Sequence, residues 1–151
     1  MAVNIIVCVK QVVDPEAPPS TFTIDEAAKR VVAAPGIPPV VNGFDENAVE
    51  AALRVRDEVG GTVTTLSVGS GFESDVVKKP LSMGCDEMVL VDDERLDNLD
   101  ASATSYVLAR AVERIGEYGL VLCGRQASDW DNAHVPLFLA ERLGLPCITT
   151  V

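Results

Sequence analysis

The sequence predicts an α/β fold in which a doubly wound, mostly parallel sheet lies between two layers of helices. Apolar runs rich in β-branched residues recur along the chain, at residues 4–9, 62–68, 88–91, 120–123 and 147–151. Each run consists mainly of apolar and β-branched residues and has no charged residue, which is typical of a strand buried on both faces. Strands that alternate with helices pair in parallel through right-handed crossovers. We therefore expect a single Rossmann-like, three-layer α/β/α domain over residues 1–151, of the adenine nucleotide α-hydrolase-like type.

Segments of helical periodicity lie between these runs, at residues 44–59, 73–83, 100–115 and 133–143. Gly60 and Gly61 end the first helix. Pro80 is expected to kink or shorten the second helix, because proline lacks the N–H that a helix interior needs. Asp100 is placed to cap the third helix.

A short β-hairpin is predicted as an insertion after the first strand. Residues 21–24 and 30–32 have strand-forming composition and flank a polar turn at 25–29. Prolines on both sides of this segment interrupt regular structure and set the hairpin apart from the sheet.

The charge and the cysteines restrict the class of protein. A net charge of −11 disfavours a nucleic-acid surface, which needs clustered Lys and Arg. The chain has neither a signal-peptide pattern nor the apolar stretch of about 18 residues that membrane insertion requires. Cys8, Cys85, Cys123 and Cys147 share no metal-binding spacing. We expect buried, reduced thiols in a cytoplasmic protein.

A ligand site is predicted where the first and fourth strands end. In a doubly wound sheet the ligand lies at the carboxyl edge, between strands whose connections go to opposite faces. Residues 8–10 and 124–126 would meet there if the first strand is central. We expect an adenosine moiety between them.

Asp129 and Asp131 either contact that ligand or cap the following helix, and the residues alone leave both readings open. His134, the one histidine, has no nucleophile near it in sequence. The sequence has the features of a binding protein and not of an enzyme.

Five segments, in order along the chain, resemble the β subunit of electron transfer flavoproteins. They are VCVKQV (7–12), NGFDENAVEAAL (42–53), SMGCD (82–86), GRQASD (124–129) and LGLP (143–146). The resemblance covers nearly the whole chain. It implies a heterodimer with an α subunit that carries FAD and takes electrons from acyl-CoA or other flavin dehydrogenases. The β subunit itself would hold AMP, or a second FAD in electron-bifurcating members. The family's carboxyl-terminal partner-docking segment is expected to be absent from this chain.

The resemblance also implies which residues bind the nucleotide. They are Cys8, Val9, Lys10, Asn42, Gly43, Phe44, Asp45, Val68, Gly124, Arg125, Gln126, Ala127, Asp129, Asp131, Asn132, Ala133, His134 and Val135. Trp130 stands where many members have glycine and is expected to fill part of the pocket. Arg125 is the candidate for tuning a flavin.

The alternative is a stand-alone adenine-nucleotide binding or sensing module of the universal-stress-protein type. Those proteins carry a glycine-rich phosphate loop near the last strand, and this sequence shows none. An adenylating enzyme of related fold would need a phosphate-gripping motif, which is also absent. The electron-carrier reading is therefore favoured.

Overall fold

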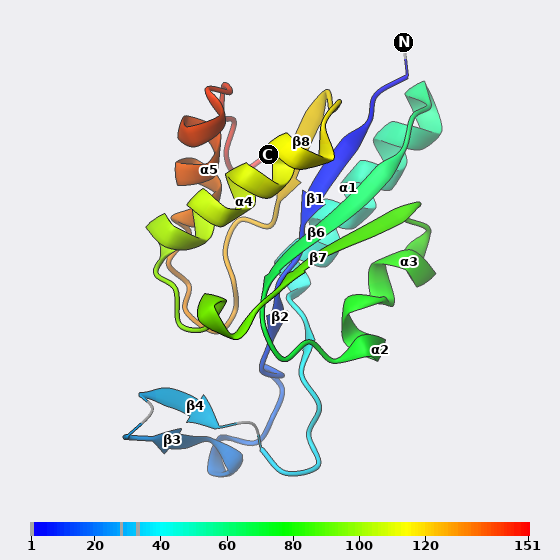
Figure 1. The fold of residues 1–151 in the computed structure, drawn as a ribbon. Helices are drawn as coiled ribbons and strands as arrows, with labels where there is room; N and C mark the ends of the chain where they lie inside the picture. The colour runs from blue at the N-terminus through cyan, green and yellow to red at the C-terminus, as the bar shows by residue number, and fades with distance from the viewer. Residues whose placement is uncertain (1, 28, 33) are drawn as a thin grey trace.

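The computed structural model describes residues 2–27, 29–32 and 34–151 and has a four-stranded parallel sheet at its centre (Figure 1). The strand order is β7-β6-β1-β8, and every neighbouring pair is parallel. The bounds are β1 (Ile5–Cys8), β6 (Val63–Gly69), β7 (Glu87–Asp92) and β8 (Leu120–Cys123). These are the first four strands of the predicted sheet. β1 lies between β6 and β8, which meets the condition set for the predicted ligand site.

Helices cover both faces of the sheet, and β1 shows how the two faces are used. Ile5 and Val7 pack on one face with α1 (Gly43–Val59), α2 (Ser74–Val77) and α3 (Lys79–Met83). Ile6 and Cys8 point to the other face, into a cluster with α4 (Ala101–Ile115) and α5 (Val135–Leu143). Successive side chains of a strand alternate between faces, so an all-apolar strand fills two cores. The three-layer α/β/α prediction is confirmed.

The predicted helix signals act as expected. Asp100 accepts a hydrogen bond from the Ala103 N–H at 2.7 Å and caps α4. Pro80 divides the predicted helix at 73–83 into α2 and α3, and it lies in the first turn of α3, where its missing N–H costs nothing. Gly60 ends α1 with a positive φ of 77°.

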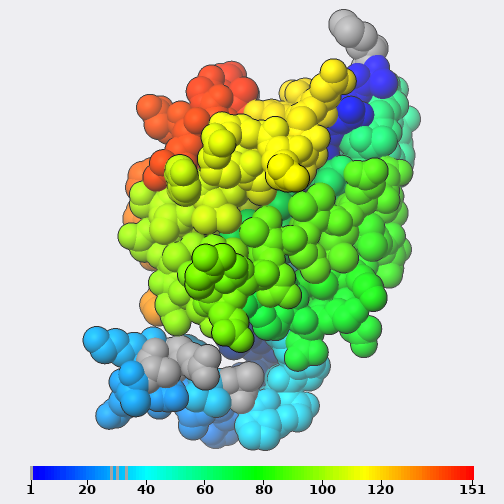
Figure 2. Space-filling model, viewed as in Figure 1, coloured from blue at the N-terminus to red at the C-terminus, as the bar shows by residue number. Residues whose placement is uncertain are grey.

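The predicted hairpin is formed by β3 (Thr23–Asp25) and β4 (Arg30–Val32), which are antiparallel with Ile24 opposite Val31. Residue 28 of the predicted turn lies outside the described residues. The insertion begins with β2 (Gln11–Val12) and η1 (Pro19–Thr21), and β5 (Val40–Val41) returns to pair with β2. The hairpin projects beyond the carboxyl edge of the sheet and forms a separate lobe in the space-filling view (Figures 1 and 2).

The prediction of a fifth strand at 147–151 is wrong. These residues have no helical or strand structure and pair with no strand of the sheet. Ile148 is 81% exposed, so the apolar character of the segment is not used in a core. A β-branched run has strand propensity, but a strand also needs a hydrogen-bonded neighbour. A short 3₁₀ helix, η2 (Glu94–Leu96), follows β7, and the sequence analysis did not predict it.

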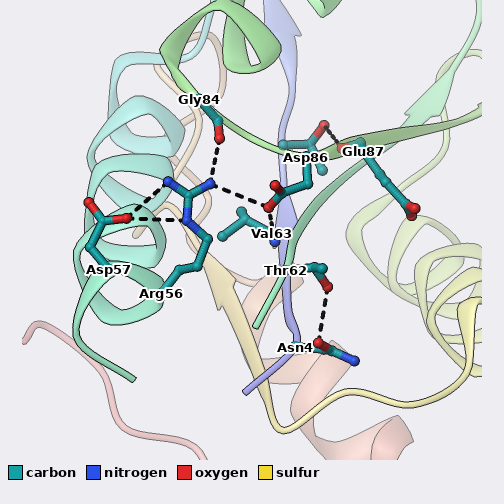
Figure 3. A network of polar contacts seen from close by, with 9 residues as sticks. Asn4, Arg56, Asp57, Thr62, Val63, Gly84, Asp86 and Glu87 are labelled. Carbon is teal, nitrogen blue, oxygen red and sulfur yellow. Dashed lines mark hydrogen bonds and ion pairs between the residues drawn. The ribbon is translucent and has the colours of Figure 1, made fainter. Parts of the chain in front are cut away.

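A polar network at the amino edge of the sheet joins α1 to β6 and β7 (Figure 3). The Asp86 carboxylate accepts from the Val63 N–H at 2.8 Å and from Arg56 Nη1 at 3.3 Å. Arg56 also donates to the Gly84 carbonyl at 2.6 Å and pairs with Asp57. The Val63 N–H, followed by Arg56, holds the pKa of Asp86 below its ordinary value.

The two aspartates of this network make a matched test. Asp86→Ala leaves the N–H of the buried Val63 without its acceptor, and we expect a loss of about 1–3 kcal/mol in the free energy of unfolding. Asp57→Ala removes only an exposed ion pair with the same arginine and should change stability little. Urea unfolding followed by circular dichroism measures both. Equal losses would contradict the role given to Asp86.

Candidate functional site

A cavity of about 380 Å³ opens at the carboxyl edge of the sheet, where β1 and β8 end side by side. Cys8 and Cys123, the last residues of the two strands, both line it. The connection from β1 runs through α1 on one face, and the connection into β8 runs through α4 on the other. The cavity therefore lies at the point where the sheet reverses its winding, as the sequence predicts.

Asp45 ties the ends of β1 and β8 together. One carboxylate oxygen accepts from the Lys10 N–H at 2.8 Å, and the other accepts from the Gly124 N–H at 3.1 Å. Asp45 lies in the first turn of α1, where the helix dipole favours a negative charge. Burial raises the pKa of Asp45 from 3.8 to about 6, while its hydrogen bonds lower it. The side chain is mainly ionised at neutral pH.

Asn42, at the N-cap of α1, fixes the loop that follows β8. Its side chain is buried and donates to the Gln126 carbonyl at 2.8 Å. Its amide oxygen accepts from the Ser128 N–H at 3.2 Å. Its own backbone N–H donates to the Lys10 carbonyl at 2.9 Å. One buried amide thus connects α1 to both segments that border the cavity.

Lys10 is the one cationic side chain among the described residues that line the cavity. Its ammonium contacts both carboxylate oxygens of Asp129, at 2.7 and 2.8 Å. Gln126 donates to Asp131 at 2.7 Å. The aspartates are engaged in this way, and His134 is the N-cap of α5 without a side-chain cap bond. The reading in which Asp129 or Asp131 caps that helix is therefore wrong, and the helix begins at residue 135 rather than 133.

Most of the site residues expected from the resemblance line this cavity. They are Cys8, Val9, Lys10, Asn42, Asp45, Val68, Gly124, Gln126, Ala127, Asp129, Asn132, Ala133, His134 and Val135.

Four expected residues do not line the cavity. Gly43 and Phe44 border a second depression, beside Ser128. The Arg125 guanidinium lies 6.0 Å from the centre of the Phe44 ring, and its Nε donates to Gln126. Asp131 meets the site indirectly, because its carboxylate accepts from Gln126 and its backbone N–H donates to the Ala127 carbonyl. Arg125 thus reaches the cavity only as a neighbour of the lining residue Gln126, and its role in tuning a flavin stays a prediction.

Sequence reasoning missed one wall of the cavity, formed by the segment between β7 and α4 and the start of α4. The segment contributes Leu96, Asp97, Asn98 and Leu99, and α4 contributes Ala101 and Thr104. The available signal was topological, because a loop that follows a parallel strand lies at the same edge as the other carboxyl ends. Trp130 also lines the cavity, as expected, and its side chain is 68% exposed.

The cysteine prediction holds for two of the four residues. Cys8 and Cys85 are buried, Cys123 is partly buried, and all four are free thiols. Cys147 is exposed because the segment that carries it forms no strand. No helix among the described residues is long and apolar enough to cross a bilayer.

Gly124 is expected to tolerate no side chain. A Cβ there would lie 2.2 Å from the Asp45 carboxylate oxygen, so Gly124→Ala must displace the carboxylate or the strand end. We expect a loss of about 1–3 kcal/mol in the free energy of unfolding. Gly43→Ala is the matched control, since a Cβ at Gly43 meets nothing within 4 Å. Thermal or urea unfolding compares the two, and a neutral Gly124→Ala would contradict the close approach.

Asp45 should make stability depend on pH with a definite sign. Its folded pKa of about 6 lies above the ordinary 3.8, so the folded state binds the proton more tightly. The stabilisation of the folded state by protonated Asp45 is therefore fully present below about pH 4, and it is lost as the pH rises through about 6. The difference in unfolding free energy between wild type and Asp45→Asn should fall from pH 4 to pH 7 and then level off. A constant or rising difference would refute the raised pKa.

A family model and the relatives of similar sequence point to the same protein family. The model of the electron transfer flavoprotein domain matches residues 29–151. The chain is 38% identical over 98% of its length to an electron transfer flavoprotein subunit beta of Thermoanaerobacterium thermosaccharolyticum, and covers 55% of that protein. It is 39% identical to the subunit beta of Megasphaera elsdenii, over 97% of this chain and 55% of that one.

A third relative is the caffeyl-CoA reductase-Etf complex subunit CarD of Acetobacterium woodii, which is 38% identical over 98% of this chain and 55% of its own length. The chain thus spans about half the length of the curated relatives it matches. The family match covers most of the chain, including the cavity loop after β8. The resemblance noted in the sequence is confirmed, and the chain belongs to the electron transfer flavoprotein family.

Proposed function

We propose that this chain is the nucleotide-holding region of an electron transfer flavoprotein β subunit, and that its cavity binds an adenine nucleotide, AMP or FAD. The observation that carries the proposal is the cavity at the winding reversal of the sheet, between the ends of β1 and β8. Open α/β sheets bind nucleotides at this position. Similarity to β subunits over nearly the whole chain supports it.

The residues present suit the adenosine monophosphate unit that AMP and FAD share. A cavity of about 380 Å³ is near the lower end of the range of about 300–1,000 Å³ for small-molecule sites. Apolar side chains such as Val9, Val68 and Leu99 offer a surface for the base. Lys10 is the group available for a phosphate. The adenosine monophosphate unit would lie against the loop after β8, which Asn42 holds through Gln126 and Ser128.

The domain's role in this proposal is positioning. It pairs with an α subunit that carries FAD, and the complex takes electrons from acyl-CoA or other flavin dehydrogenases in the cytoplasm. If the β subunit holds FAD, that cofactor supplies the redox chemistry, and the protein sets its orientation and electrostatics. No side chain of this domain makes or breaks a substrate bond. The name of the Acetobacterium relative, a subunit of a reductase–Etf complex, supports such an assembly.

Analysis of the released small molecule tests the proposal. The purified protein is denatured, and the supernatant is examined by liquid chromatography with mass detection. AMP identifies a structural nucleotide, whereas FAD identifies a redox-active site in this subunit. Release of neither, together with no binding of added AMP or FAD in equilibrium dialysis, would overturn the proposal.

Lys10 should contribute to affinity through the phosphate. Lys10→Ala is expected to weaken AMP binding about tenfold or more, since a charged hydrogen bond contributes about 1.5–3 kcal/mol. Adenosine lacks the phosphate, so its binding should change much less. Lys78→Ala is the matched control, because Lys78 is exposed between α2 and α3 and does not line the cavity. Equal weakening of AMP and adenosine would place the phosphate elsewhere.

A further inference from the structure

Two of the four cysteines lie side by side in the wall of the cavity. Cys8 ends β1 and Cys123 ends β8, and the two are register partners in neighbouring parallel strands. Their segments are far apart in the sequence, so the pairing is a product of the fold. The other two cysteines are elsewhere: Cys85 packs in the cluster on the α1 face, and Cys147 is exposed.

The two side chains point to the same face of the sheet. Both belong to the cluster with Leu108 and Leu139, with Cys8 buried in it and Cys123 packed against it. A hydrogen bond between the two sulfur groups, followed by burial, raises the pKa of the Cys8 thiol well above its ordinary value. The register and the shared face of the sheet make the two thiols neighbours in one cluster. Cys123 is only partly buried, and it is the one more open to a molecule in the cavity.

We propose that Cys8 and Cys123 are a redox-responsive dithiol, which a small-molecule disulfide converts into an intramolecular disulfide. The Cys123 sulfur attacks one sulfur of the oxidant, RSSR, and releases the first RSH. The Cys8 sulfur then attacks Cys123 Sγ in the mixed disulfide and releases the second RSH, which takes the Cys8 proton. Two protein thiols are oxidised, one external disulfide is reduced, and two RSH molecules leave.

The geometry permits this bond but does not favour it strongly. Neighbouring strands lie about 4.8 Å apart, within the range of about 4.4–6.8 Å for the Cα atoms of disulfides. Side chains on paired strands are held nearly parallel, so their Cβ atoms must approach for the bond to form. Strained disulfides are reduced easily, which suits a reversible switch better than a structural link.

Oxidation should change the cavity, because the bond draws together the two strand ends that form its wall. Asp45 holds Lys10, two residues after Cys8, and Gly124, which directly follows Cys123. The consequence for ligand rests on the proposed function: the oxidised protein should bind adenine nucleotide several-fold more weakly. Trp130, the single tryptophan, lines the cavity and reports on it without any ligand.

The test uses the full chain with Cys147→Ser, which removes the exposed thiol. The protein is treated with 2-hydroxyethyl disulfide, free thiols are alkylated, and peptides are mapped by mass spectrometry. We expect loss of two hydrogen atoms and a crosslinked peptide pair containing Cys8 and Cys123, reversed by dithiothreitol, while Cys85 is alkylated. Trp130 emission should shift on oxidation and return on reduction. A stable mixed disulfide on either cysteine, or no reaction under native conditions, would overturn the proposal.

The matched control adds Cys123→Ala to this background and keeps Cys8. It should form no crosslink, and its Trp130 emission should not respond to the oxidant. Equilibrium dialysis with AMP and FAD then compares reduced and oxidised protein. If neither form binds nucleotide, the proposed function fails while the crosslink stands or falls by the peptide map. If the crosslink forms but affinity and emission are unchanged, the pair is not coupled to the cavity, and the switch is refuted.

Discussion

The candidate site depends on one buried carboxylate. β1 and β8 end at Cys8 and Cys123, and beyond them the backbone N–H groups of Lys10 and Gly124 donate to a side chain and not to a strand. Asp45 accepts hydrogen bonds from both Lys10 and Gly124, although Gly124 is 79 residues away along the chain. A buried N–H without an acceptor costs about as much as a lost hydrogen bond. The same carboxylate therefore satisfies two donors and fixes the separation of the strand ends that border the cavity.

This arrangement decides how the first turn of α1 is used. A helix N-terminus is a ready site for an anion, but here Asp45 and Glu46 already supply negative charge at that point. Glu46 is itself paired with Lys79 of α3. Asn42 directs its side chain to the loop after β8 and not to a ligand. The amino end of α1 thus organises the cavity wall, and a bound phosphate must find its partner elsewhere.

The sequence predicts the parts of the structure that depend on local pattern. All-apolar runs identified the four strands, and Asp100, Gly60 and Pro80 marked helix boundaries because each acts on its own backbone neighbours. What failed depends on partners distant in sequence. The segment 147–151 has strand composition but pairs with no strand of the sheet. The wall from 96 to 104 has no motif at all, since its place follows from topology.

The charges around the cavity limit what a phosphate can gain there. Asp45, Asp97 and Asp129 line it with Lys10 as their counter-charge, so the site has an excess of negative charge among the described residues. An incoming phosphate must take Lys10 from Asp129, in a pair whose lysine side chain is 46% exposed. Lys10 makes charged hydrogen bonds with either partner, so one phosphate gains only the difference between two such pairs. The Asp129 carboxylate that the exchange releases opposes a second phosphate. If the cavity binds the proposed nucleotide, Asp129 keeps the lysine in position before binding and limits the charge that the cavity accepts.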